Sequence, residues 1–121
     1  MEFKYQIEFP NIKSRKDECE RVRLQFPDKI PVICEKDPSC TLEALVKTKY
    51  LIKRTITINQ FKRTLLKKFK VESLEALFLF VTNKTQKVAV IGDVSFGEVY
   101  DKYKDDDGFL YLIYTNEKIW G

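Results

Sequence analysis

The sequence contains no histidine and only four glycines. Without a histidine, no imidazole is available to activate Cys19, Cys34 or Cys40 as a nucleophile. The four glycines are not arranged as a phosphate-binding loop. The acidic run Asp105-Asp106-Asp107 lacks the ligand spacing of a calcium loop, so we interpret it as a solvated turn. We therefore expect no enzyme: no catalytic residues, no cofactor and no metal site.

Cysteine pairs and long apolar runs are also missing. Three cysteines are an odd number without Cys-x-x-Cys spacing, which favours reduced thiols of a cytosolic protein over a disulfide framework or a zinc site. No window approaches the roughly 18 apolar residues of a membrane span, and charged residues interrupt the first ten positions, unlike a signal peptide. Any attachment to a membrane is therefore expected to be peripheral or covalent.

Acidic residues are absent from residues 47–70, which carry nine lysines and arginines. This segment has a net charge of +9, and because the whole chain has a net charge of +4, the remaining residues have a net charge of −5. Such a basic band raises the local concentration of anionic partners and speeds their encounter. Tyr50 and Phe61 lie among these charges, as the stacking residues of a nucleic-acid-binding domain do, but a solvated basic helix face is the commoner outcome.

The hydrophobic pattern predicts alternating helices and strands. The spacing of Cys19, Val22 and Phe26 predicts one or two short helices before Pro27. Residues 30–36 predict a strand, with Pro31 at its beginning or beside an open groove. Next we expect a helical turn at 41–45, a strand at 49–54 and a helix at 58–69 capped by Thr57. The apolar run at 77–82 predicts a strand that is buried on both faces and lies at the centre of the sheet. A short edge strand at 88–91, a helix from Ser95 to Tyr103 and a final strand at 109–114 complete the prediction.

The order of these elements predicts the fold class α+β. A hairpin, a helix that crosses over it and a final strand that returns parallel to the first make up the β-grasp arrangement. We expect a single domain over residues 1–121. It would comprise an N-terminal helical extension at 1–26, a β-grasp core at 27–115 and a flexible C-terminal tail at 116–121.

Five sequence features, taken in chain order, carry a family resemblance: FPDKIPVICEK at 26–36, KYL at 49–51, QF at 60–61, YKDDDGFLY at 103–111 and Gly121. Together they resemble the autophagy ubiquitin-like modifiers of the GABA-receptor-associated-protein type over nearly the whole chain. The resemblance implies a ubiquitin-like β-grasp with two additional N-terminal helices, which ubiquitin lacks. It also implies a modifier that acts in autophagosome formation.

Members of that family pass from activating to conjugating enzymes as thioesters until the terminal glycine is joined to the amine of phosphatidylethanolamine. A cysteine protease processes and deconjugates them. The resemblance gives this role to Gly121, whose lack of a side chain leaves the carboxylate accessible to enzyme clefts. It implies a cytoplasmic protein that reaches autophagosome membranes when lipid-conjugated. The Trp120-Gly121 ending is also similar to the sister modifier that is joined to a lysine of another protein, so this second function stays open.

The family also binds autophagy receptors and adaptors through short peptides, and the resemblance implies no nucleic acid partner. An aromatic residue and an aliphatic residue three positions later enter two pockets while the peptide pairs with the second strand. By matching position, the aromatic pocket would comprise Glu18, Val22, Pro31, Ile33, Lys49, Leu51 and Phe109, and the aliphatic pocket Tyr50, Ile52, Phe61 and Leu65.

Three lysines, Lys29, Lys47 and Lys49, would meet the acidic residues that flank such peptides, each pair contributing no more than about 1 kcal/mol. Two positions depart from the family pattern: Lys53 stands where many relatives have proline, and Thr64 where they have an apolar residue. These departures predict a second pocket that is more polar or shallower.

Overall fold

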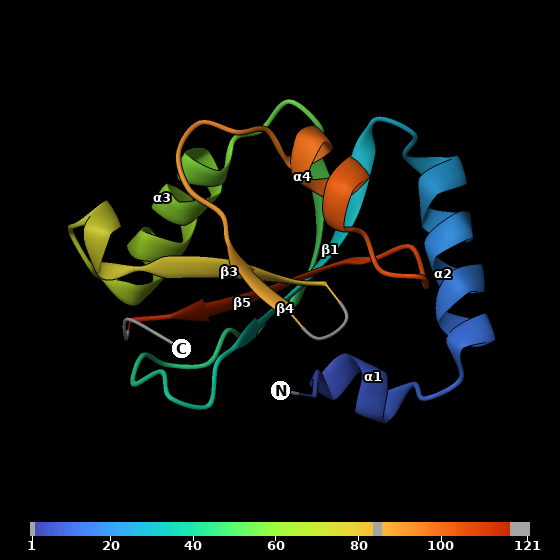
Figure 1. Cartoon of the computed structure of the whole chain (residues 1–121), viewed down its shortest axis with the longest axis horizontal. Helices are drawn as coiled ribbons and strands as arrows, with labels where there is room; N and C mark the ends of the chain where they lie inside the picture. Colours follow the sequence, from blue (N-terminus) through green and yellow to red (C-terminus); the bar gives the residue numbers. More distant parts are fainter. Residues whose placement is uncertain (1, 84–85, 117–121) are drawn as a thin grey trace.

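The computed structural model describes residues 2–83 and 86–116 (Figure 1). In chain order the elements are α1 (Lys4–Glu8), α2 (Ile12–Gln25), β1 (Lys29–Lys36), β2 (Lys49–Lys53), α3 (Ile58–Phe69), the 3-10 helix η1 (Leu74–Ala76), β3 (Phe78–Asn83), β4 (Gln86–Ala89), α4 (Phe96–Tyr103) and β5 (Leu110–Thr115). Within these described residues, no helix has the length and apolar character needed to cross a membrane. Two helices precede the first strand, as predicted.

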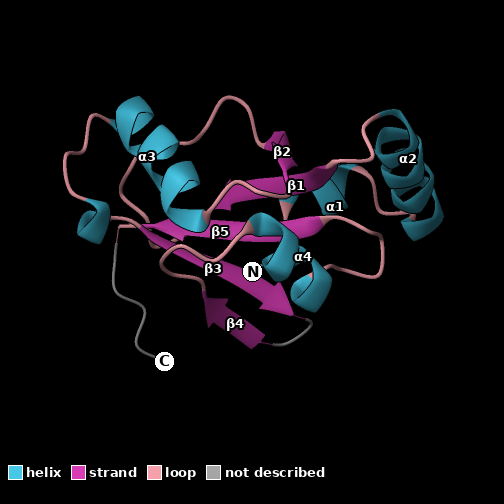
Figure 2. Cartoon of the chain, turned by 90° about the horizontal axis from the view of Figure 1, so that it is seen from above, coloured by secondary structure: helices cyan, strands magenta, loops and turns pink. Residues whose placement is uncertain are grey.

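The five strands form one mixed sheet in the order β2-β1-β5-β3-β4 (Figure 2). β1 pairs antiparallel with β2, where Ile30 lies opposite Ile52, and parallel with β5, where Ile33 lies opposite Tyr111. β3 pairs antiparallel with both β5 and β4. Because the last strand returns parallel to the first, the sheet has the β-grasp arrangement that the order of elements predicts.

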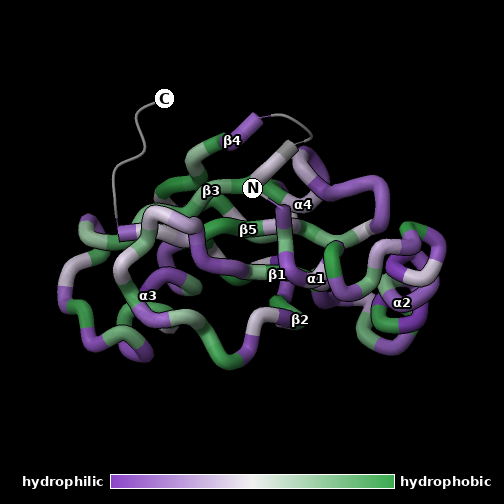
Figure 3. Tube along the Cα trace, turned by 90° about the horizontal axis from the view of Figure 1, so that it is seen from below, coloured by the Kyte–Doolittle hydropathy of each residue, from purple (hydrophilic) through white to green (hydrophobic). Residues whose placement is uncertain are grey.

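The middle strands β1 and β5 are buried on both faces. On the face covered by α3 and α4, Val32, Leu110 and Leu112 are fully inaccessible to solvent. A smaller cluster on the opposite face joins Ile33 and Tyr111 to Phe3, just before α1, and to Cys19 of α2; α1 itself lies below the sheet in Figure 1. Figure 3 shows hydrophobic residues along β3 and β5 and hydrophilic residues along the connection after α4. Burial of each such large apolar side chain contributes about 1.5–3 kcal/mol, so these two clusters hold the helices on the sheet.

The helices α3 and α4 begin where the sequence predicts. The side chain of Thr57 accepts a hydrogen bond from the backbone N–H of Gln60. In return, the side chain of Gln60 accepts one from the backbone N–H of Thr57, and the two bonds form a capping box. Ser95 caps α4 by accepting from the N–H of Glu98. The buried side chains of α3 include Ile58, Phe61 and Leu65, at the predicted spacings of three and four. Both predicted helices are therefore confirmed.

The first helix is fixed to the sheet by a buried carboxylate. Glu35 of β1 is only 5% exposed and accepts hydrogen bonds from the backbone N–H groups of Lys4 and Tyr5, at 2.7 and 3.1 Å. These N–H groups belong to the first turn of α1, where no carbonyl of the helix can accept from them. Phe3, just before α1, is buried against Tyr111 with ring centroids 4.7 Å apart. Both contacts hold α1 against the face of the sheet opposite α3 and α4.

The turn before β5 differs from its sequence interpretation. We expected residues 105–107 to be solvated, but Asp107 is 1% exposed. Its carboxylate accepts hydrogen bonds from Nε of Arg15 at 2.9 Å, from the hydroxyl of Tyr111 and from the N–H of Phe109. The interpretation is wrong for Asp107 because its charge is neutralised by a residue 92 positions away in the chain, which local spacing does not reveal.

The connection between β1 and β2 also differs from the prediction, since it has no helical turn at 41–45. The hydroxyl of Tyr114 accepts a hydrogen bond from the N–H of Leu45 at 3.0 Å and donates one to the carbonyl of Glu43 at 2.8 Å. Backbone groups that would close a helical turn are thus bonded to the last strand instead. The packing of this connection against β5 overrides its weak local helix preference.

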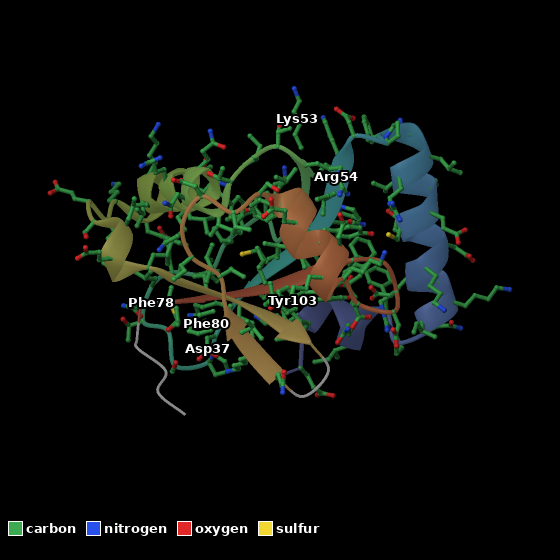
Figure 4. All side chains as sticks on the ribbon, turned by 45° about the horizontal axis from the view of Figure 1, so that its top comes forward. Asp37, Lys53, Arg54, Phe78, Phe80 and Tyr103 are labelled. Atoms are coloured by element: carbon green, nitrogen blue, oxygen red, sulfur yellow. The ribbon has the colours of Figure 1, made fainter. Side chains whose placement is uncertain are left out.

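The strand predicted at 77–82 does not lie at the centre of the sheet. It forms β3, which lies between β5 and the edge strand β4, and its residues Phe78 and Phe80 remain partly exposed (Figure 4). The cluster on that face takes its residues from β1, β5 and the N-terminal helices, and it does not extend over β3. The predicted edge strand is confirmed as β4, two residues earlier than expected.

We predict that Arg15→Ala lowers the free energy of unfolding by about 3 kcal/mol, because it leaves the carboxylate of Asp107 buried without its cation. Equilibrium urea unfolding followed by circular dichroism measures this change. Arg21→Ala is the matched control: Arg21 pairs with Glu18 on the surface, where solvent screens the pair, so its loss should change stability far less. Equal effects of the two substitutions would contradict a structural role for the buried pair.

Candidate functional site

The strand β2 lies at one edge of the sheet, and in the described part of the chain it pairs only with β1. The N–H of Cys34 donates to the carbonyl of Thr48 at 2.8 Å, so these two residues form a hydrogen-bonded pair. Because bonded and non-bonded pairs alternate along an antiparallel ladder, Lys49 and Leu51 direct their N–H and C=O groups away from β1. β2 therefore offers backbone donors and acceptors to a further strand.

Pro31 lies opposite Leu51 in this ladder. N–H directions alternate along a strand, and that of Cys34 points to β2, so the nitrogen of Pro31 faces the other way. Pairing with β5 begins only at Val32. The missing N–H thus removes no hydrogen bond from the sheet, which explains how β1 tolerates a proline beside its open partner.

A cavity of about 410 Å³ opens beside the edge, on the face of the sheet that α2 flanks. It has an apolar wall and a rim of lysines, formed by Val22, Lys29, Pro31, Lys47, Lys49, Leu51 and Phe109. Leu51 is 38% exposed at this position, whereas Phe109 is buried. An apolar hollow next to unpaired backbone groups has the features of a site that binds an extended peptide.

One rim lysine is held in place by charge. Nζ of Lys49 lies 3.0 Å from Oε1 of Glu18, and Nη2 of Arg21 lies 2.8 Å from the same oxygen. The ammonium group also lies 5.4 Å from the ring centroid of Tyr5 and 5.7 Å from that of Phe109. Hydrogen bonds from Arg21 and then from Lys49 hold the pKa of Glu18 below its usual value, so Glu18 is ionised at neutral pH.

The residues matched to the aromatic pocket by resemblance are mostly brought together. Val22, Pro31, Lys49, Leu51 and Phe109 line the cavity, and so do Lys29 and Lys47, which we expected only to meet flanking acidic residues. Glu18 contributes indirectly, as the partner of Lys49. Ile33 is fully buried in the cluster with Phe109 and Tyr111, so it offers a ligand no surface.

The four residues matched to the aliphatic pocket are packed into the core. Tyr50 is 9% exposed, Ile52 8%, Phe61 5% and Leu65 0%. The rings of Tyr50 and Phe61 meet edge to face, with centroids 5.5 Å apart. These four side chains therefore offer a ligand little surface. The same burial prevents Tyr50 and Phe61 from stacking on bases, which removes the main argument for a nucleic-acid partner.

Sequence reasoning missed the contribution of α1. The ring of Tyr5 packs edge-on against Phe109, with centroids 5.2 Å apart, and lies next to the ammonium group of Lys49. No sequence signal distinguishes Tyr5 from other aromatic residues near the N-terminus. A larger cavity of about 620 Å³ lies between α2 and the turn at 106–108. None of its described lining residues belongs to a strand, so we place the site at β2.

Cysteines and carboxylates are the side chains of this chain that could provide catalytic or metal chemistry. All three cysteines are buried, and burial raises the pKa of Cys19 to about 11, so its thiol is protonated at neutral pH. Over residues 2–83 and 86–116, no group of three or more histidine, cysteine, aspartate or glutamate side chains is placed to hold a metal ion. Gly121, for which covalent chemistry was predicted, lies outside the described residues.

Comparison with known proteins decides the family. The family described as "Autophagy protein Atg8 ubiquitin like" matches residues 14–121. The chain belongs to the Atg8 family. It is 36% identical to the Autophagy-related protein 8 of Coccidioides immitis (strain RS) over 121 residues, which is 100% of this chain and 99% of that protein. The protein of the same name from Emericella nidulans is also 36% identical, with 98% of its length covered.

The solved structure of Trypanosoma brucei ATG8 matches this chain with a TM-score of 0.80 at 31% identity, and the match covers 100% of both chains. The resemblance to autophagy ubiquitin-like modifiers is thereby confirmed, and so is the ubiquitin-like α+β fold. As a member of the Atg8 family, the chain is a ubiquitin-like protein of autophagy.

We predict that the pKa of Glu18 in this Atg8-family protein is below its ordinary value and rises in the Arg21→Ala variant. The ionised form is favoured by its two cations, so its contribution to stability is present above the unfolded-state pKa and is lost as the pH falls through the folded-state pKa. An NMR titration of the Glu18 carboxyl carbon measures both values. Arg23→Ala, one charge lost on the same helix, should leave the pKa nearly unchanged, and an equal rise there would argue against the specific pairing.

Proposed function

We propose that this Atg8-family protein is a modifier joined through Gly121 to phosphatidylethanolamine, and that on autophagosome membranes it recruits partners carrying short aromatic-anchored peptides. The single observation that supports the recruiting role best is the open edge of β2 beside the lysine-rimmed cavity. A peptide added to β2 gains backbone hydrogen bonds from the residues facing outward, Lys49 and Leu51. Its aromatic side chain fits the cavity, where burial of apolar surface stabilises the complex.

Charge supports the choice of peptide. Three lysines, Lys29, Lys47 and Lys49, line the cavity, and one of them, Lys49, pairs with Glu18. Acidic residues on either side of the aromatic anchor would therefore be attracted to this end of the groove. Each exposed pair contributes little, and the main effect is on the rate of encounter and on its dependence on salt. Acidic flanks are thus part of the proposed ligand.

The proposed covalent role rests on family membership and on the glycine at position 121. β5 runs to Thr115, and the last residues, which include Trp120 and Gly121, follow this strand. Activating and conjugating enzymes would carry the Gly121 carboxyl as a thioester, and the lipid amine would displace the thiol to form an amide. A cysteine protease that processes and deconjugates the protein, with a cytoplasmic pool of the unconjugated form, completes the proposed cycle. Because Trp120 is shared with the sister modifier, conjugation to a protein lysine is the alternative product.

We predict that Leu51→Ala weakens binding of an acidic peptide with an aromatic-x-x-aliphatic core about tenfold or more, since Leu51 contributes apolar surface at the rim of the cavity. Isothermal titration calorimetry measures the change, and urea unfolding confirms that the variant is folded. Leu24→Ala is the matched control, because Leu24 is 85% exposed on α2 and does not line this cavity. Equal affinities of the two variants would place peptide binding elsewhere.

We predict that Gly121 forms an amide with phosphatidylethanolamine when the protein is incubated with its activating and conjugating enzymes, ATP and phosphatidylethanolamine vesicles. Mass spectrometry identifies the adduct and its position. A chain that lacks Gly121 should remain unmodified. A product on a protein lysine, with no lipid adduct, would favour the alternative, and no product where a relative reacts would contradict both.

A further inference from the structure

Helix α1 meets the peptide site through the side chain of Tyr5. Its ring packs edge-on against Phe109, with centroids 5.2 Å apart, and lies 5.4 Å from the ammonium group of Lys49. Phe109 and Lys49 both line the cavity beside β2, whereas Tyr5 is not among the described residues that line it. Tyr5 therefore supports one wall residue and one rim residue from outside the cavity.

The position of Lys49 depends on several weak contacts. Its side chain is 44% exposed, and its ammonium group lies 3.0 Å from Glu18 and close to the rings of Tyr5 and Phe109. A partly exposed ion pair fixes a flexible lysine only weakly, and each aromatic ring adds an attraction for the cation. Without the ring of Tyr5, Lys49 would sample more rotamers. A peptide would then have to immobilise Lys49 on binding, which lowers the affinity.

The position of Tyr5 depends in turn on Glu35. Helix α1 has five residues, fewer than an isolated helix needs to be stable, and none of these described residues is buried. The carboxylate of Glu35 accepts hydrogen bonds from the backbone N–H of Lys4 at 2.7 Å and from that of Tyr5 itself at 3.1 Å. Together with the burial of Phe3 just before the helix, these bonds attach α1 to the sheet.

Glu35 and the cavity wall share the same support, strand β1. Glu35 and Ile33 lie two positions apart on this strand, so their side chains point to the same face of the sheet. Ile33 is buried in one cluster with Phe3 and Phe109, and Tyr5 packs against that cluster. Release of α1 would remove Phe3 and Tyr5 from this packing while the strands stay paired. The two states of the site are therefore α1 docked and α1 released.

We propose that Glu35 is a positioning residue for peptide binding: by holding α1 on the sheet it keeps Tyr5 against Lys49 and Phe109. The inference rests on the proposed function, because it specifies what regulates the same groove. Docking of α1 and binding of an aromatic-anchored peptide at β2 stabilise one another, since coupling between two sites is reciprocal. Any event that releases α1 lowers the affinity of the groove for its peptide.

The first test replaces Tyr5. Calorimetric titration of the full chain with an acidic peptide that has an aromatic-x-x-aliphatic core should give about fivefold weaker binding for Tyr5→Ala, at the lower end of the range for such couplings. Tyr5→Phe should bind as the original chain does, because the support comes from the ring. Urea unfolding checks that both variants are folded. Unchanged affinity in Tyr5→Ala, or equal losses in both variants, would overturn the proposal.

The second test replaces Glu35. In Glu35→Gln one of the two accepting oxygens becomes an NH₂ group that faces a backbone N–H, so α1 is held less firmly and the affinity should fall about as much as in Tyr5→Ala. The double variant should bind no more weakly than either single variant, because both substitutions disrupt the same support. Additive losses would show that Glu35 does not act through Tyr5.

Asp37→Asn is the matched control for Glu35→Gln. Asp37 is also a buried carboxylate, directly after β1, but it accepts from the N–H of Ser39 and pairs with Lys87, away from α1. Its replacement should leave the peptide affinity unchanged. A loss equal to that of Glu35→Gln would mean that any buried carboxylate on this face matters, and the specific role of Glu35 would be wrong.

Hydrogen exchange provides a readout that a merely structural role would not change. The backbone N–H groups of Lys4 and Tyr5 should exchange about fivefold more slowly when the peptide is saturating, since reciprocity requires the same factor in both directions. In Glu35→Gln both should exchange faster than in the original chain. Exchange at α1 that does not respond to the peptide would contradict the coupling.

The outcomes distinguish this inference from the proposed function. If the peptide binds the original chain, Tyr5→Ala and Glu35→Gln equally well, the positioning role is wrong, whereas peptide recruitment by the groove stands. If the original chain does not bind the peptide, or binds it equally well when its aromatic residue is replaced by Ala, the recruiting role itself fails and the inference fails with it.

Discussion

The buried ion pair of Arg15 and Asp107 is the interaction on which the site depends. It connects α2 to the turn before β5, two segments that are far apart in the chain, and so helps to bring Val22 and Phe109 to the lining of one cavity. The carboxylate of Asp107 also bonds to the backbone of Phe109, which sets the direction of the chain as it enters β5. A buried charge pair of this kind tolerates little change in geometry, because either ion alone is poorly solvated in the interior.

The open edge of β2 is a constraint as well as an opportunity. An exposed strand edge invites pairing with any other chain, and proteins commonly protect such edges with lysine. Here Lys49 and Lys53 stand at outward-facing positions of β2, and Lys53 extends into solvent (Figure 4). The same charges that discourage nonspecific association would favour acidic peptides. Protection of the edge and selection of the ligand therefore have one physical cause.

The basic band at 47–70 divides into several surfaces once the chain is folded. Lys49 is paired with Glu18 and lines the cavity. Arg54, which directly follows β2, is paired with Asp101 of α4. Lys68 lies over Tyr50 on the other side of the edge, and Lys67 lies next to η1. A charge count along the sequence does not separate these roles, because they depend on which helix face or strand face each residue occupies.

Much of the fold and part of the site follow from the sequence. The cap of helix α3 and the spacing of its apolar residues can both be recognised within a short stretch of sequence. The segments at 26–36 and 103–111 are enough to suggest the family. Five residues that line the cavity were predicted by matching their positions to the family. The sequence did not predict which of the matched residues are exposed and which are buried. That Ile33 and Leu65 are fully buried depends on how strands from opposite ends of the chain stack against helices.

By itself, then, the sequence determined the elements, their order and the charge along them, since propensity, capping and periodicity act over a few residues. Only the tertiary structure decided that Asp107 is buried, that Tyr5 packs against Phe109 of the cavity wall and that Phe61 and Leu65 are buried beside Tyr50. These features are contacts between residues tens of positions apart, and their energies depend on packing distances that exist only after the chain has folded.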